Sequence, residues 1–211
     1  MNKSIVQLLL LSLLGILVAG VVKPRKNAMI LVAGSAESML VEVEASLLKK
    51  AYQPEWVWSP ARLEVELDLS DRGNCFLYIV GPSNSLGIQF ANRTLTPKDL
   101  TAMLRKYCLL STVVVSACNS GIFVDEMAHQ KGMIVIASNT ESSPMCRDGA
   151  LNTIFDVCFI KTMNDWRTFT WGESFLRTSK CVWDEEKIQN RPHTLPTAWF
   201  GMPPTRTLPW R

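Results

Sequence analysis

The run TVVVSA at residues 112–117 is the most β-branched stretch of the chain, and MIVIAS at residues 133–138 resembles it. Both runs are almost wholly apolar, which is typical of strands that are buried on both faces of a parallel sheet. Between them, residues from about Ile122 to Gln130 have helical character. A strand, a crossover helix and a second strand predict a βαβ unit at the centre of an α/β domain.

The same alternation extends in both directions from this centre. We expect further strands at residues 28–33, 56–58, 75–80 and 197–201, and helices at residues 37–52, 60–69, 149–163 and 171–188. Another helix should start after Thr96, because Thr is a good N-cap and Pro97 suits the first turn. The pattern predicts a mostly parallel central sheet with helices on both faces.

Composition excludes several classes of protein. The chain has 211 residues, of which 47% are hydrophobic and 19% charged, so it should fold rather than stay disordered. Its formal charge is only +3, and no dense basic tract occurs outside residues 23–26, so we expect no nucleic-acid partner. Six cysteines without a C-x-x-C pair, and only two histidines, argue against a structural metal site. Disulfide pairing is left open, and no cofactor is expected.

The N-terminal segment predicts contact with a membrane. Residues 5–22, IVQLLLLSLLGILVAGVV, carry no charge, and they lie between Lys3 and the basic residues of the segment 23–27. This pattern fits a cleaved export signal or an uncleaved membrane anchor. We therefore expect residues 1–22 to be a signal peptide or anchor, 23–27 a basic linker, 28–201 the folded domain and 202–211 a Pro-rich tail. The domain should lie outside the cytoplasm, exported, periplasmic or membrane-anchored.

Chemistry is expected at the carboxyl ends of the strands, where open α/β sheets bind their ligands. Residues 34–38, 81–87, 118–121 and 139–146 occupy these ends. Cys118 directly follows the central strand and is the candidate nucleophile, because a strand end next to a helix start favours a thiolate. The alternative is that Cys118 is a small apolar residue that ends a core strand.

The segment VVVSACNSG at residues 113–121 resembles the nucleophile block of the legumain (haemoglobinase) family of cysteine peptidases. The segments IVIASNTESSPMC at 134–146 and RTLTPKDL at 93–100 extend the likeness, which is strongest to exported bacterial members. The resemblance covers roughly residues 28–201. It implies a caspase-like three-layer α/β sandwich with a mostly parallel central sheet and helices on both faces.

The resemblance also implies roles for individual residues. Cys118 stands at the nucleophile position, and the backbone amides of Ser83 and Cys118 would form an oxyanion hole. Ser142, Ser143 and Asp156 match substrate-binding positions, although loop capping by the serines and a surface carboxylate at Asp156 are equally simple interpretations. No metal ligand is implied.

One departure from the family pattern concerns the catalytic base. The family strand that matches residues 76–80 ends in His-Gly, whereas this chain has Pro82 and Ser83 there. A Pro side chain neither accepts nor donates a proton, so the usual Cys-His dyad is absent. His129 is expected to be a solvated helix residue, and His193 lies in the Pro-rich end of the chain.

These observations predict a pseudopeptidase or a weakly active peptidase that binds a peptide or protein segment at the former substrate site. The first alternative is an active cysteine-type endopeptidase or transpeptidase with a non-standard base, for which His193 is the reasonable candidate. The second alternative is a doubly wound domain that binds a small ligand. It has little support, because neither a G-x-G-x-x-G nor a G-x-x-x-x-G-K-[ST] motif occurs.

Overall fold

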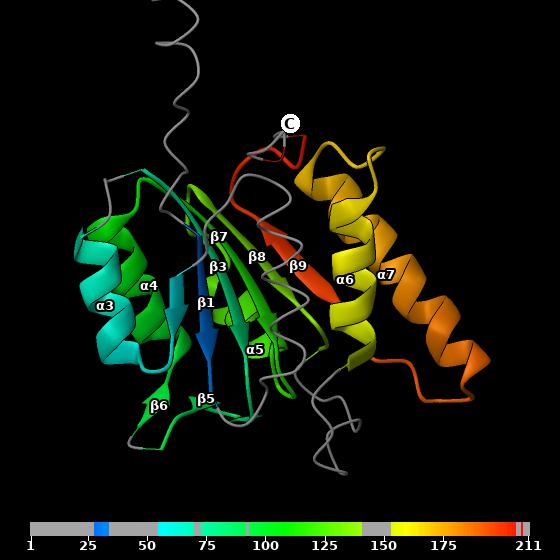
Figure 1. Ribbon diagram of the computed structural model, residues 1–211, viewed down its shortest axis with the longest axis horizontal. Helices are drawn as coiled ribbons and strands as arrows, with labels where there is room; N and C mark the ends of the chain where they lie inside the picture. The colour runs from blue at the N-terminus through cyan, green and yellow to red at the C-terminus, as the bar shows by residue number, and fades with distance from the viewer. Residues whose placement is uncertain are drawn as a thin grey trace, which may run out of the picture.

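The structure, a computed structural model, describes residues 28–33, 55–69, 73–91, 93–140, 153–205 and 208. Its centre is a six-stranded sheet with the order β2-β1-β3-β7-β8-β9 (Figure 1). The strands are β1 Ala28–Val32, β2 Glu55–Val57, β3 Asn74–Val80, β7 Leu110–Ser116, β8 Met133–Ala137 and β9 Thr197–Phe200. The N-terminal segment and the helix expected at residues 37–52 lie outside the described residues.

Neighbouring strands of this sheet are parallel except for β9, which runs antiparallel to β8 at the edge. The longest pairing joins β3 to β7, with Asn74 opposite Leu110 and Val80 opposite Ser116. Nearly every residue of β1, β3, β7 and β8 is buried. The apolar runs of the sequence therefore form the central strands, as predicted.

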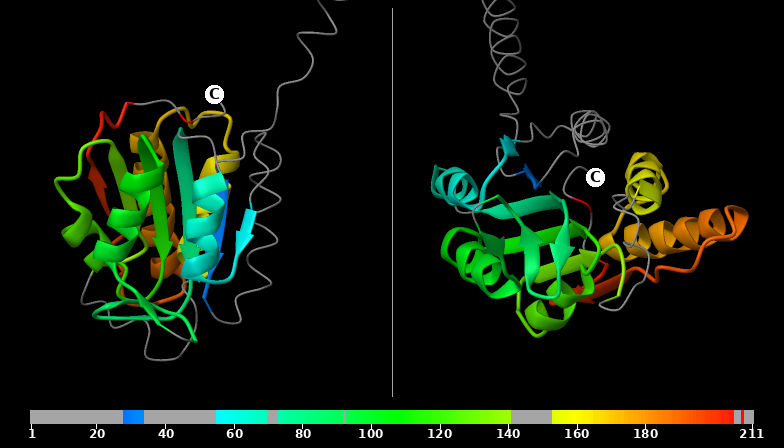
Figure 2. Two further views of the ribbon diagram at one scale, coloured as in Figure 1. Left: turned by 90° about the vertical axis from the view of Figure 1, so that its left-hand side faces the viewer. Right: turned by 90° about the horizontal axis from the view of Figure 1, so that it is seen from below.

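Helices cover both faces of the sheet (Figures 1 and 2). On one face α3 Pro60–Leu69, α4 Pro97–Tyr107 and α5 Gly121–Met127 pack on a core that includes Leu77 and Ile79. On the other, α6 Thr153–Asn164 and α7 Trp171–Ile188 pack on a core that includes Phe76 and Tyr78. Because successive side chains of β3 point to opposite faces, one strand supplies both cores. The predicted three-layer sandwich is confirmed.

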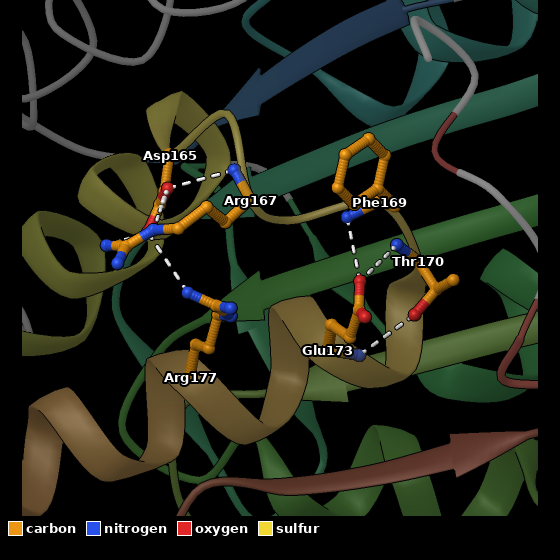
Figure 3. A network of polar contacts seen from close by, with 6 residues as sticks. All are labelled: Asp165, Arg167, Phe169, Thr170, Glu173 and Arg177. Carbon is orange, nitrogen blue, oxygen red and sulfur yellow. Dashed lines mark hydrogen bonds and ion pairs between the residues drawn. The ribbon is translucent and has the colours of Figure 1, made fainter.

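Polar contacts join the two helices of the second face. The Asp165 carboxylate, just after α6, bonds to Arg167 at 2.9 Å and to Arg177 of α7 at 3.0 Å (Figure 3). A capping box starts α7: the Glu173 amide donates to the Thr170 hydroxyl, and the Glu173 carboxylate accepts from the Thr170 amide (Figure 3). These contacts fix the turn between α6 and α7.

Two features differ from the prediction. A second sheet of β4 Ser83–Asn84, β5 Gly87–Gln89 and β6 Thr94–Leu95 lies at the carboxyl edge of the main sheet and was not predicted. The helix α5 ends at Met127 rather than near Gln130, and His129 has a left-handed φ of 71° that no helix continues through. The first four residues of the helix expected at 149–163 lie outside the described residues, and its described part, α6, begins at Thr153.

Two disulfides tie helices to their neighbours. Cys75 of β3 bonds to Cys108 at the end of α4, and Cys158 of α6 bonds to Cys181 of α7. None of the helices in the described part of the chain combines the length and apolar character needed to cross a membrane.

Candidate functional site

The loops that follow β3 and β7 meet at the carboxyl edge of the sheet, because the two strands are parallel neighbours in register. The amide of Asn119 donates a hydrogen bond of 2.9 Å to the hydroxyl of Ser83, and the Asn119 side chain donates to the Ser83 carbonyl at 3.5 Å. Asn119 is the residue after Cys118. The structure thus brings together the two loops that the sequence assigned to one site.

Gly81 sets the path of the first loop. A Cβ atom on Gly81 would lie 2.5 Å from the Cβ atom of Ala33, so only glycine allows this close approach to the end of β1. The carbonyl of the next residue, Pro82, accepts a hydrogen bond of 2.8 Å from the amide of Gln89, which ties the loop to β5. Pro82 itself is exposed and carries no group that can take up a proton.

Buried polar side chains fix the backbone on both sides of Cys118. Before it, the Ala117 carbonyl accepts hydrogen bonds of 3.1 Å from the Ser138 hydroxyl and from the Asn139 side chain. After it, the Ser120 hydroxyl bonds to the Asn139 side chain and accepts from the Asn139 amide, both at 3.2 Å. Ser120, Ser138 and Asn139 are wholly buried. The Cys118 backbone is therefore held by side chains from the end of β8.

Cys118 is half-buried, and its sulfur is in a disulfide. The sequence left the pairing of the six cysteines open, and the structure holds none of the described cysteines as a free thiol. A disulfide sulfur is neither a thiolate nor a nucleophile. In this oxidised form, the candidate nucleophile is chemically blocked.

Asp156 lies in α6 and is only 1% exposed, so the interpretation as a surface carboxylate is wrong. The Tyr78 hydroxyl of β3 donates a hydrogen bond to one of its oxygens, Oδ1. The other oxygen, Oδ2, and the buried Ser116 hydroxyl have no hydrogen-bond partner among the described residues. Burial raises the pKa of Asp156 to about 7, although the bond from Tyr78 lowers it. The same burial, with the nearby carboxylate, raises the pKa of Tyr78 well above 10.

The two histidines are held at other places. His193 stacks on Trp183 with the ring centroids 3.5 Å apart, and its Nδ1 lies 3.3 Å from the buried carboxylate of Glu186. His129 lies beyond the end of α5 and packs on Trp199, so the prediction of a helix residue is wrong. Contacts with Trp183 and Glu186 thus hold the His193 ring against the last turns of α7.

Ser142 and Ser143 lie outside the described residues, and their binding role stays a prediction. Within the described ranges, no group of three His, Cys, Asp or Glu side chains is placed to hold a metal ion. Sequence reasoning missed Ser120, Ser138 and Tyr78, the polar groups that surround the strand ends. The signal that points to them is a polar residue inside or directly after an otherwise apolar strand.

This arrangement belongs to a known class of fold. No protein-family model matches the sequence, and no curated protein matches it. Solved structures do match: the crystal structure of drICE at a TM-score of 0.59 and 12% identity, covering 90% of this chain and 92% of that one. Caspase-1 from Spodoptera frugiperda matches at a TM-score of 0.56 and 11% identity, covering 89% of this chain and 90% of that one. The Drosophila initiator caspase Dronc matches at a TM-score of 0.53 and 11% identity, covering 88% of this chain and 84% of that one.

The chain therefore has a caspase-like fold, as the resemblance implied. At this level of identity the likeness concerns the fold alone. The resemblance to legumain-like peptidases in particular stays a prediction.

Proposed function

We propose that the chain is an exported or membrane-anchored relative of the caspase and legumain type of cysteine peptidases that binds a peptide segment without efficient cleavage. The peptide would lie at the carboxyl edge of the sheet, beside Cys118. The observation that carries the proposal is that the Cys118 sulfur is in a disulfide. The resemblance to legumain-like peptidases supports it, because it would place Pro82 at the position of the base. A cysteine peptidase needs both a thiolate and a proton acceptor.

Features that serve binding are kept. Backbone amides donate hydrogen bonds whatever the side chain, so those of Ser83 and Cys118 would hold a peptide carbonyl in the proposed site. The bond between Ser83 and Asn119 keeps the two loops together at this point. Ser142 and Ser143 would add hydroxyls to the site, whereas Asp156 is covered by the fold and would not contact the peptide.

The two described disulfides support the location. Disulfides persist in oxidising compartments and are rare in the cytosol. Cys75–Cys108 and Cys158–Cys181 both join core elements, so a folded chain of this kind fits export. The apolar residues 5–22 would be the signal or the anchor.

A peptide library tests binding against cleavage. The full chain is immobilised, exposed to a proteome digest with and without dithiothreitol, and both retained peptides and new termini are read by mass spectrometry. We expect a reproducible retained set and no new termini, and Cys118→Ala should keep most of that set. A chain that retains no peptides contradicts the binding role.

A gain-of-function variant tests the missing base. Under reducing conditions Pro82→His should raise cleavage of retained peptides, since general base catalysis is worth ~10²–10⁴-fold. Pro82→Ala is the matched control, because it removes the ring without adding a base. If the unaltered chain cleaves peptides and His193→Ala abolishes the cleavage, the chain is instead an active hydrolase with an unusual base.

A further inference from the structure

The turn between α6 and α7 exposes apolar side chains. Trp166 in this turn is 72% exposed, and Leu176 in the second turn of α7 is 67% exposed. The ion pair of 3.0 Å between Asp165 and Arg177 holds the turn beside the second turn of α7 (Figure 3). Exposed Trp and Leu side chains are enriched on helices that lie at the surface of a membrane, and the Trp ring suits this place because it has an apolar body and a polar N–H group.

Basic side chains line a groove next to these two residues. The groove has a volume of about 490 Å³ and lies between α6 and α7. Three carboxylates line it together with four cations, Lys161, Arg167, Arg177 and Lys180. Asp165 pairs with both arginines, whereas Lys161 makes no ion pair with any residue in the described part of the chain. The groove therefore has an excess of positive charge, which favours an anionic ligand.

We propose that this α6–α7 surface, made of Trp166, Leu176 and the four basic residues of the groove, docks on an anionic phospholipid bilayer. The cations would bind phosphate headgroups, and the two apolar side chains would enter the boundary between the headgroups and the acyl chains. The inference rests on the proposed location at a membrane and is independent of peptide binding.

The place of the surface in the fold favours a bilayer as the occupant. Strand β1 begins at Ala28, and α6 runs antiparallel to the central strands, so the start of β1 and the α6–α7 turn both lie toward the top of Figure 1. The apolar segment 5–22 ends six residues before Ala28. An extended chain of that length reaches only about 20 Å. A membrane that holds residues 5–22 would therefore lie close to this edge of the domain.

Docking at this edge would orient the domain on the membrane. Ser83 and Cys118 follow β3 and β7 at the carboxyl ends of these strands, at the edge opposite the α6–α7 turn. A bilayer at the amino ends of the strands would leave the carboxyl ends facing the solvent. The proposed peptide site would then stay open to peptides in solution.

Quenching of Trp fluorescence by brominated acyl chains tests the docking. The full oxidised chain is reconstituted with vesicles of phosphatidylcholine alone, or of an equal mixture of phosphatidylcholine and phosphatidylglycerol. We expect stronger quenching in the anionic vesicles, and Trp166→Phe should remove this increase. Trp58→Phe is the matched control, because Trp58 is 52% exposed and follows β2 at the opposite edge of the sheet. It should leave the increase unchanged.

Charge reversal in the groove tests the role of the cations. A basic residue near an anionic membrane surface changes affinity about fivefold, so Lys161→Glu/Lys180→Glu should lower the ratio of docked to undocked chain by about 30-fold. The double variant Lys98→Glu/Lys187→Glu makes the same change of charge at exposed positions near the opposite edge, and it should have little effect. High salt should weaken the docking of the unaltered chain, because it screens exposed charges.

Flotation of the vesicles separates docking from anchoring. A chain that floats with both kinds of vesicle but shows no increase in quenching is anchored without docking, which overturns the inference and leaves the proposed location intact. A chain that floats with neither kind overturns both. An increase that persists in Trp166→Phe, or that the two charge-reversed pairs reduce equally, also contradicts docking through the α6–α7 surface.

Discussion

The buried carboxyl of Asp156 makes stability depend on pH in a direction opposite to that of ordinary salt-bridged carboxylates. Its pKa is raised from 3.8 to about 7 by burial, so the folded chain keeps a proton that the unfolded chain releases above about pH 4. The stability that Asp156 contributes is therefore fully present below pH 4 and is lost as the pH rises through 7. At about 1.4 kcal/mol for each tenfold change in proton affinity, the loss is about 4 kcal/mol.

Urea unfolding of the oxidised chain between pH 4 and pH 8 measures this effect. The contributions of other carboxylates must be subtracted. For example, Arg167 holds the pKa of Asp165 at about 2, so the stability that Asp165 contributes is lost on acidification. Asp156→Asn provides the reference, since it keeps the shape and cannot ionise. The free energy of unfolding of the native chain, relative to Asp156→Asn, should fall by about 4 kcal/mol from pH 4 to pH 8.

Tyr78→Phe is the matched second variant. The Tyr78 hydroxyl donates to the carboxylate and lowers the pKa of Asp156, so its removal should move the fall in stability to higher pH. A difference between the native chain and Asp156→Asn that stays flat from pH 4 to pH 8 would refute the reasoning. It would mean that water or a cation reaches the carboxyl.

Three further substitutions test the disulfide between α6 and α7, the α7 cap and the buried hydrogen bonds at Ala117. Replacing Cys158 and Cys181 together by Ala should lower the free energy of unfolding by about 3 kcal/mol, measured in urea, because the 23-residue loop is no longer closed; an unchanged midpoint contradicts this. Thr170→Ala should cost about 1 kcal/mol through loss of the α7 cap, whereas Thr170→Ser should cost little. Ser138→Ala should cost about 1–3 kcal/mol, because it removes a donor to the Ala117 carbonyl and an acceptor for the Ala117 amide; hydrogen exchange at Ala117 should then increase.

The parts of the fold that could be predicted are those with strong local signals. The central strands are continuous apolar runs, and α7 begins and ends as expected because a Thr-x-x-Glu capping box precedes its apolar face. The strands β4 and β6 have two residues each, which is too short for any periodicity to appear. They form because the loop after β3 folds back on itself, and that depends on tertiary contacts.

The candidate site also has parts that the sequence predicts and parts that it does not. The apolar run before Cys118 predicts that this residue lies at a strand end. It does not predict that the sulfur is in a disulfide, because cysteine pairing depends on which loops meet in space. Likewise Asp156 is 78 residues from Tyr78, and no local pattern shows that the two side chains bond under the sheet. Only the packing of α6 on β3 makes Asp156 a buried group.

Burying the polar side chains around Cys118 costs free energy of folding unless they form hydrogen bonds. Ser120, Ser138 and Asn139 would each cost about 1–3 kcal/mol if left unpaired in the interior, and apolar residues would fill the same space without that cost. The hydroxyl of Ser138 and the side chain of Asn139 donate to the Ala117 carbonyl, directly before the cysteine, and the Ser120 hydroxyl, two residues after it, bonds to the side chain and the amide of Asn139. A strand that ended in a merely structural residue would need no such support. A fixed backbone at the strand end is what the proposed binding of a peptide segment would need, because backbone donors and acceptors must be held in place to pair with the segment.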